Sequence, residues 1–242
     1  MKNRIAIVGY TGLVGGNLYK QYKKNYKYID LFNSKNISKI KKKSLYKKII
    51  CAGLPAEKWK ANKFPKKDKL NTLKLIKNLK KSKTEKFILI STIDVNFKHT
   101  YGKNRMYLEN FVKKNFKNYS VVRLPGVFGE GLKKNVIYDL INKNQLEKIY
   151  YNDRYQWYDL SLLKKNIEEI EKKKKKLYEF YSEPIINRDI IKLFNTKYKF
   201  KKRTEPIIYK FKPKNGYFFD KKYILKRINK FLKQQWNLNY LF

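Results

Sequence analysis

Three glycines that follow the first apolar segment constrain the fold more than any other feature of the chain. Residues 4–9 form a short run rich in β-branched side chains, which predicts a buried strand. The run ends in Gly9, Gly12 and Gly15, and apolar residues recur at helical spacing from residue 13 to about residue 23. This strand, G-x-x-G-x-x-G turn and helix predict a βα unit whose helix N-terminus can hold a phosphate group. A tight turn without any ligand is the alternative interpretation.

Further apolar segments alternate with amphipathic ones through the first half of the chain. Strands are predicted at four more places, residues 28–32, 48–52, 87–91 and 120–124. Helices are predicted at 69–80 and 104–116, and the inward face of the first is expected to carry Leu70, Leu73, Ile76 and Leu79. This order predicts an α/β fold, a Rossmann-type doubly wound parallel sheet with helices on both faces.

The pattern changes after Pro125, where glycines mark a loop. Helices are then predicted near residues 135–142, 159–170 and 187–194, and from Asp220 onward. We therefore expect a nucleotide-binding Rossmann domain in residues 1–125 and a small, mainly helical substrate lobe in residues 126–242, packed on the same unit across a cleft. No apolar run approaches the ~18 residues of a membrane-spanning helix, and the start of the chain does not read as a signal peptide. A cytoplasmic protein without a membrane partner is expected.

The formal charge of +41 is the feature that most invites a nucleic-acid function. Only seven of the 60 basic residues are Arg, however, and bidentate reading of bases depends on Arg. Lys, Asn, Ile, Tyr and Phe dominate the composition, as A/T-rich codons alone would produce. We expect no specific nucleic-acid partner, although weak, salt-sensitive binding to polyanions follows from the charge. With one Cys and one His, neither a disulfide framework nor a metal site is expected.

The end of the second predicted strand bears on which dinucleotide would bind. NAD sites usually place a carboxylate there for the ribose hydroxyls. Here Asp30 comes too early, and Asn33 and Ser34 occupy the tip with Lys35 beside them. A neutral tip next to a cation accommodates a 2′-phosphate, which favours NADP over NAD. The next strand ends in small residues at 51–53, past which a dinucleotide can lie, and Cys51 is expected to be an inert buried thiol.

Taken together, these segments resemble the extended short-chain dehydrogenases/reductases of the NAD-dependent epimerase/dehydratase type. The resemblance covers nearly the whole chain. It rests on residues 9–15 (GYTGLVG), 51–53 (CAG), 87–95 (FILISTIDV), Tyr101 with Arg105, 121–131 (VVRLPGVFGEG), 156–163 (QWYDLSLL) and 183–190 (EPIINRDI). It implies an NAD(P)-dependent oxidoreductase or epimerase that acts on a nucleotide-activated sugar for surface polysaccharide. A homodimer formed by helices 69–80 and 104–116 is also implied.

The resemblance assigns three residues to catalysis. Tyr101 would exchange a proton with the substrate, Thr92 would orient the same substrate oxygen, and Arg105 stands where the family has a Lys. Tyr101 and Arg105 lie four residues apart and so share a helical face. The residues expected at the cofactor are Gly9, Thr11, Gly12, Leu13, Val14, Gly15, Asn33, Ser34, Cys51, Ala52, Gly53, Leu124 and Pro125. Those expected at the substrate are Asp94, Lys133, Lys134, Asn135 and Gln156.

Three departures from the family pattern keep a second hypothesis open. Arg105 differs from Lys in shape and donor geometry, and the segment between Thr92 and Tyr101 is shorter than the family's substrate loop. Ile93 fills the first of two acidic positions that the dehydratases carry, so a 4,6-dehydratase mechanism lacks its acid. The alternative is a dinucleotide-binding regulatory or scaffold protein with a degenerate catalytic set.

Overall fold

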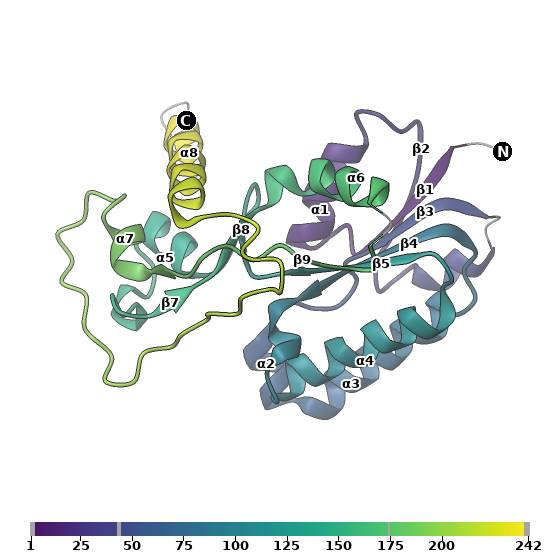
Figure 1. The fold of residues 1–242 in the computed structure, drawn as a ribbon, viewed down its shortest axis with the longest axis horizontal. Coiled ribbons are helices and arrows are strands. Elements are labelled where there is room, and N and C mark those ends of the chain that lie inside the picture. Colours follow the sequence, from purple (N-terminus) through teal and green to yellow (C-terminus); the bar gives the residue numbers. More distant parts are fainter. Residues whose placement is uncertain (1–2, 43–44, 174, 240–242) are drawn as a thin grey trace. The chain divides into compact units, whose positions relative to one another are not determined.

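Five parallel strands form the centre of the computed structural model, which describes residues 3–42, 45–173 and 175–239 (Figure 1). They are β1 (Arg4–Val8), β2 (Tyr28–Phe32), β3 (Tyr46–Cys51), β4 (Thr84–Thr92) and β5 (Tyr119–Leu124). The sheet order is β2-β1-β3-β4-β5-β9, with the short β9 (Leu177–Glu179) at the edge. The predicted Rossmann-type sheet is confirmed. Its order reverses between β1 and β3, which is where ligands bind in open α/β sheets.

Helices cover both faces of this sheet (Figure 1). On one face lie α1 (Leu13–Tyr22) and α6 (Leu163–Lys172), and on the other α3 (Pro65–Leu79) and α4 (Thr100–Asn115). The short α2 (Lys58–Lys63) follows β3, and single 3-10 turns occur at η1 (Ile37–Lys42) and η2 (Ile93–Asn96). Alternate strand residues point to the two faces, so both sides of β1 are buried.

The buried face of α3 differs from the predicted one. Leu70 and Leu73 are 65% and 38% exposed, whereas Asp68, Thr72, Leu75 and Leu79 are buried. The helix begins at Pro65, four residues before the predicted start, and buries Asp68, whose carboxylate accepts from the Asn104 amide at 2.7 Å. A buried polar contact therefore sets the orientation of this helix, which a pattern of apolar residues does not reveal.

The chain divides into two compact units. The first comprises Met1–Leu124 and Ser161–Tyr178, and the second Pro125–Leu160 and Glu179–Phe242. The sequence predicted a single boundary after residue 125. It did not predict that the chain comes back and that α6 belongs to the first unit. Two long-range contacts hold α6 there: the Lys48 ammonium lies 2.6 Å from the Glu171 carboxylate, and the Lys164 N–H donates to the Gln21 side chain at 3.0 Å.

The second unit contains short strands as well as helices. β6 (Gly126–Phe128) pairs with β8 (Trp157–Asp159), and β7 (Arg154–Tyr155) pairs with β10 (Ile185–Ile186). Its helices are α5 (Val136–Asn142), α7 (Asn187–Ile191) and α8 (Lys221–Asn239), with further 3-10 turns at η3 (Leu146–Lys148) and η4 (Leu160–Leu162). The side chain of Asp220 accepts the N–H of Tyr223 at 2.6 Å and so caps α8, as predicted.

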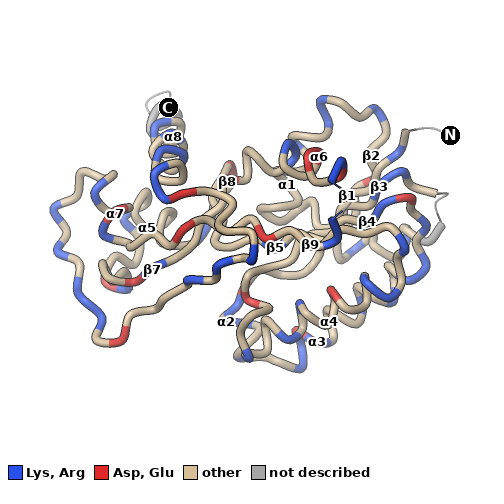
Figure 2. The backbone as a smooth tube through the Cα atoms, in the orientation of Figure 1, with Lys and Arg blue, Asp and Glu red and all other residues tan. Residues whose placement is uncertain are grey.

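Lys and Arg occur along all parts of the described chain, on helices, strands and loops alike (Figure 2). This distribution matches a compositional origin of the charge better than a dedicated basic surface. Among the helices that the structure describes, none combines the length and the apolar character that a membrane span requires.

Candidate functional site

The glycine loop connects β1 to α1, and two of its glycines are required by packing. Gly9 has φ +88°, and a Cβ built on it would lie 2.3 Å from the Ala52 carbonyl oxygen. A Cβ on Gly15 would lie 2.1 Å from the Gly9 carbonyl oxygen. Any other residue at either position would force the backbone apart. These two glycines therefore allow β1, the end of β3 and the start of α1 to approach one another closely.

Gly12 has no such internal reason to be glycine. Its φ is −86°, an ordinary extended conformation, and a Cβ there would meet only the Gly9 carbonyl oxygen, at 3.4 Å. It is the N-cap residue of α1, no side chain caps this helix, and the first turn carries no acidic residue. A helix start of this kind offers backbone N–H groups and a positive dipole to an anion. The cradle fits a dinucleotide phosphate, with Thr11 exposed and Leu13 and Val14 half-buried beside it.

The tip of β2 lies next to this loop. Val8 and Phe32 are register partners, and the Gly9 N–H donates to the Phe32 carbonyl at 2.7 Å. Asn33 follows, with its amide 3.5 Å from the Tyr10 hydroxyl and its side-chain oxygen accepting the Lys35 N–H. Ser34 and Lys35 are exposed.

Asp30 does not reach this tip. Its carboxylate lies 3.0 Å from the Arg4 guanidinium and accepts the Tyr46 hydroxyl at 2.7 Å. The carboxylate that an NAD site usually carries at the strand end is thus replaced by Asn33 and Ser34, with the Lys35 cation beside them.

The end of β3 forms the other wall of the loop. The Cys51 side chain is fully buried, and burial raises the pKa of its thiol to about 12, as expected for an inert core cysteine. The Ala52 N–H donates to the Val8 carbonyl at 2.9 Å, and a Cβ on Gly53 would lie 2.9 Å from a Val8 methyl group. Small, half-buried residues, Ala52 and Gly53, thus follow the buried thiol at this strand end.

Thr92 ends β4, and its register partner in β5 is Leu124, so both predicted site residues lie at the carboxyl edge of the sheet. One residue earlier, the Ser91 hydroxyl donates to the Glu109 carboxylate at 2.7 Å. Glu109 is fully buried and accepts two bonds from Arg123, at 3.0 and 2.8 Å. This satisfied network ties the ends of β4 and β5 to α4 and gives Thr92 a rigid support.

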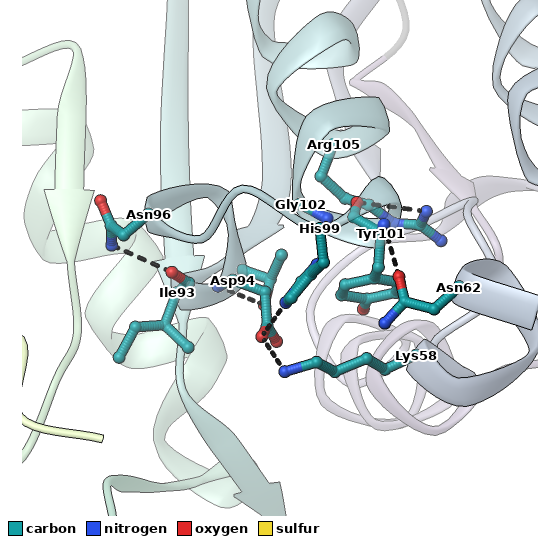
Figure 3. A network of polar contacts seen from close by, with 10 residues as sticks. Lys58, Asn62, Ile93, Asp94, Asn96, His99, Tyr101, Gly102 and Arg105 are labelled. Atoms are coloured by element: carbon teal, nitrogen blue, oxygen red, sulfur yellow. Dashed lines mark hydrogen bonds and ion pairs between the residues drawn. The ribbon is translucent and has the colours of Figure 1, made fainter. Parts of the chain in front are cut away.

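Tyr101 lies in the first turn of α4 and is only 8% exposed. Its backbone N–H donates to the Asn62 side chain at 3.0 Å (Figure 3). Burial raises the pKa of the phenol, and the positive charge of Arg105 opposes that rise. The phenol is therefore neutral at neutral pH and able to donate a proton.

Arg105 is a buried clamp on Tyr101. Its guanidinium lies over the Tyr101 ring, 3.9 Å from the centroid, and forms an ion pair with Asp68. It also donates to the Pro55 carbonyl at 2.6 Å, and its side chain is 5% exposed. The sequence prediction that these two residues share a helical face is confirmed. The cation is engaged by the ring face, by Asp68 and by the Pro55 carbonyl, so this arrangement does not support a direct contact with a cofactor ribose.

Two of the predicted substrate residues in the second unit use their side chains for hydrogen bonds to other groups of the protein. Asn135 caps α5 by accepting the N–H groups of Ile137 and Tyr138, and its amide donates to the Val127 carbonyl. Gln156 is 1% exposed and bonds to Ser182 and to Phe211 with both ends of its amide. The structure thus gives both side chains a structural role. Lys133 and Lys134 are exposed, and they and Pro125, the first residue of the second unit, remain predicted contacts.

Comparison with known proteins yields matches of structure alone: no family model and no curated protein sequence matches the chain. An NAD-dependent NDP-hexosamine 5,6-dehydratase involved in tunicamycin biosynthesis is 12% identical, with a TM-score of 0.72 over 98% of each chain. A dTDP-4-dehydrorhamnose reductase from Yersinia enterocolitica is 15% identical, with a TM-score of 0.71 over 96% of this chain and 99% of that one. A UDP-N-acetylglucosamine 4-epimerase from Methanobrevibacter ruminantium, in complex with UDP-N-acetylmuramic acid, is 16% identical, with a TM-score of 0.70 over 96% of this chain and 98% of that one.

The chain shares its fold with these three proteins, built on the Rossmann-type doubly wound sheet. The likeness extends over nearly the full length of the chain and of each of these enzymes. Because fewer than one residue in five is identical, it is a likeness of fold, and the roles of individual residues rest on the geometry described above.

Within this fold, sequence reasoning missed two residues at the same edge of the sheet. Lys58 in α2 places its ammonium 2.7 Å from the Asp94 carboxylate, and His99, the N-cap of α4, approaches the same oxygen at 3.3 Å (Figure 3). Asp94 also accepts the Thr92 hydroxyl at 3.2 Å. His99 is the single histidine of the chain and lies two residues before Tyr101, which was a signal in the sequence; Lys58 was hidden among 60 basic residues.

Proposed function

We propose that the protein is an NAD(P)-dependent enzyme that oxidises, reduces or epimerises a nucleotide-activated sugar. The observation that carries this proposal is the placement of a glycine loop with an uncapped helix start at the same sheet edge as Thr92 and, after it, Tyr101. Three enzymes of the same fold are named for reactions on nucleotide sugars. We also propose that the modified sugar serves surface polysaccharide synthesis.

Residues of the glycine loop and the strand ends would hold the cofactor. The N-terminus of α1 at Gly12 would hold the phosphates, and Asn33, Ser34 and Lys35 would hold the adenosine ribose. When bound, a nicotinamide dinucleotide supplies the acceptor or donor of a hydride. We favour NADP, because Asp30 is held by Arg4 and Tyr46 and a cation stands beside the neutral tip.

Two side chains of the protein act on the substrate. Tyr101 exchanges a proton with the oxygen of the reacting carbon, and its neutral phenol is the donor form at neutral pH. Thr92 holds the same oxygen. Arg105 keeps the phenol in place by stacking, and its positive charge opposes the rise in the phenol pKa that burial causes.

Binding and turnover test the proposal separately. We expect calorimetry to detect NADPH or NADH at micromolar concentrations, and we expect turnover of one member of a panel of UDP- and dTDP-sugars. Tyr101→Phe should abolish turnover and retain dinucleotide binding. Lys35→Gln should weaken NADPH more than NADH, while Lys39→Gln, an exposed lysine of η1, serves as the matched control. Failure to bind either dinucleotide would overturn the proposal.

The buried state of Arg105 favours a second candidate, a dinucleotide-binding protein without catalysis. In this case the cation would be only a structural clamp. Dinucleotide binding without turnover of any sugar, together with unchanged cellular function of Tyr101→Phe, would select this candidate over the enzyme.

We also propose that Lys133 and Lys134 bind the diphosphate group of the substrate.

We further propose that the chain forms a homodimer through α3 and α4. Leu70, Leu73 and Tyr107 are large exposed side chains on these helices. Leu70→Glu should shift the sedimentation of the protein from dimer to monomer, and Lys20→Glu on α1 should leave it unchanged. A wild-type monomer at high concentration would contradict the dimer.

A further inference from the structure

We propose that Asp94 is a positioning residue that fixes the direction of the Thr92 hydroxyl and thereby prepares the site for a substrate alcohol. The inference rests on the proposed function, in which Thr92 contacts the reacting oxygen of the sugar. It assigns Asp94 a role different from the direct substrate contact predicted from the sequence.

The Thr92 hydroxyl and Asp94 form two reciprocal hydrogen bonds. The hydroxyl donates its proton to the Asp94 carboxylate oxygen Oδ2 at 3.2 Å, and it accepts the Asp94 backbone N–H, also at 3.2 Å. A hydroxyl has one proton and two lone pairs. The proton and one lone pair are therefore used within the protein, and the remaining lone pair can only accept a bond. A sugar hydroxyl donates such a bond, whereas a keto group does not.

Two donors on the other carboxylate oxygen keep Asp94 in this orientation. The Lys58 ammonium lies 2.7 Å from Oδ1, and His99 Nε2 lies 3.3 Å from the same atom. The Asp94 side chain is 13% exposed, whereas those of its donors Lys58 and His99 are 38% and 23% exposed, so the carboxylate itself is the sheltered partner. Because both donors approach Oδ1, the carboxylate cannot rotate away from Thr92 without breaking a charge-assisted bond.

The tautomer of His99 follows from its second contact. The Gly102 N–H donates to His99 Nδ1 at 3.0 Å, so Nδ1 carries a lone pair and the proton of the neutral ring lies on Nε2, which faces Asp94 (Figure 3). The imidazole is thereby fixed between the start of α4 and Asp94. Since it is the single histidine of the chain, its ring nitrogens give isolated NMR signals.

A double-mutant cycle separates positioning from other roles of Asp94. The probes are UDP-glucose and UDP-N-acetylglucosamine as alcohols and dTDP-4-dehydrorhamnose as a keto sugar. Asp94→Asn keeps the shape of the side chain and gives it donor groups, so the Thr92 proton is no longer directed away from the substrate. We expect kcat/KM for the alcohol that is turned over to fall about 10-fold or more, and the preference for alcohol over keto sugar to fall with it. In a Thr92→Val background the same change should alter kcat/KM less than about twofold.

The control is Glu57→Gln, which removes a carboxylate beside α2 that pairs with Lys60 at 2.7 Å. It should leave both kcat/KM and the alcohol preference unchanged. In the wild type, ¹⁵N NMR should show the His99 proton on Nε2, and Asp94→Asn should shift that signal.

Three results would overturn the inference. One is an Asp94→Asn effect of equal size with and without Thr92, which would mean direct contact or a general structural role. Another is a His99 proton on Nδ1, which contradicts the contact network. The last is a wild-type protein that turns over no sugar. This result would contradict the proposed function itself, and it is seen before any substitution is made.

Discussion

Gly12 has room for a methyl group, whereas Gly9 and Gly15, the other two glycines of the loop, do not. Because Gly12 has an ordinary φ and an uncrowded Cβ position, Gly12→Ala should fold with a loss of about 1 kcal/mol or less, the usual difference between Gly and Ala at an N-cap. The methyl group would occupy the phosphate cradle, so we expect affinity for NADPH or NADH to fall about 10-fold or more. Urea denaturation and calorimetry measure the two effects.

Gly15→Ala is the matched comparison, because its Cβ would lie 2.1 Å from a backbone oxygen. It should lower stability by about 1–3 kcal/mol or more. Equal loss of stability in the two variants would contradict the functional interpretation of Gly12.

Arg105 offers a second prediction at the level of a single residue. Arg105→Met would leave the Asp68 carboxylate buried, with the Asn104 amide still bonded to it but the cation gone. Removal of one partner of a buried ion pair costs about 3–5 kcal/mol. We expect a loss of this size in urea denaturation, with a smaller loss for Arg105→Lys. Arg4→Met, which breaks a more exposed pair with Asp30, is the control and should cost about 1 kcal/mol or less.

The contact between α4 and the η2 turn decides where Tyr101 lies. A Cβ on Gly102 would lie 2.1 Å from the Asp94 carbonyl and 2.9 Å from the Phe97 carbonyl. Gly102→Ala should therefore displace the start of the helix, lower the thermal midpoint by several degrees and reduce turnover by about 10-fold or more. Lys103→Ala, an exposed position on the same helix, should change neither quantity. A fully active Gly102→Ala would show that this contact does not position the tyrosine.

Element prediction succeeded where the local pattern was strong. β2 lies at the predicted residues 28–32, and α8 buries the predicted Ile224 and Ile228. For the face of α3 it was right about Leu79 and wrong about Leu70 and Leu73, which are exposed. The helix predicted from residue 159 starts with the 3-10 turn η4 and becomes α-helical at Leu163, and Asp159 pairs with Arg227 at 2.6 Å. In both cases the deciding partner is distant in sequence.

Buried phenols give the whole molecule a characteristic response to alkaline pH. Burial raises the pKa values of Tyr22, Tyr46, Tyr101 and Tyr155 above the ordinary value of about 10. Because the folded values exceed the unfolded ones, the stabilising contribution of the neutral phenols is complete below about pH 10 and is lost as the pH rises through the folded values.

A tyrosine titration followed by ultraviolet absorbance tests this response. We expect these four phenols to ionise only above pH 10, with or after unfolding, as a separate late part of the titration. In denaturant all should titrate together. A single transition near pH 10 in the folded protein would contradict the buried environment of these side chains.

From the amino-acid pattern one can predict the glycine loop, the positions of the parallel strands, Thr92 at the end of β4 and Tyr101 after it. These features depend on backbone conformation and on the spacing of apolar residues over a short segment, and both can be recognised in the local sequence. The tertiary structure decided the return of α6 to the first unit, the burial of Arg105 against Asp68, the structural roles of Asn135 and Gln156, and the meeting of Lys58, Asp94 and His99. Each depends on side chains brought together by the packing of separate elements, and the direction of a side chain in three dimensions is not contained in its spacing along the chain.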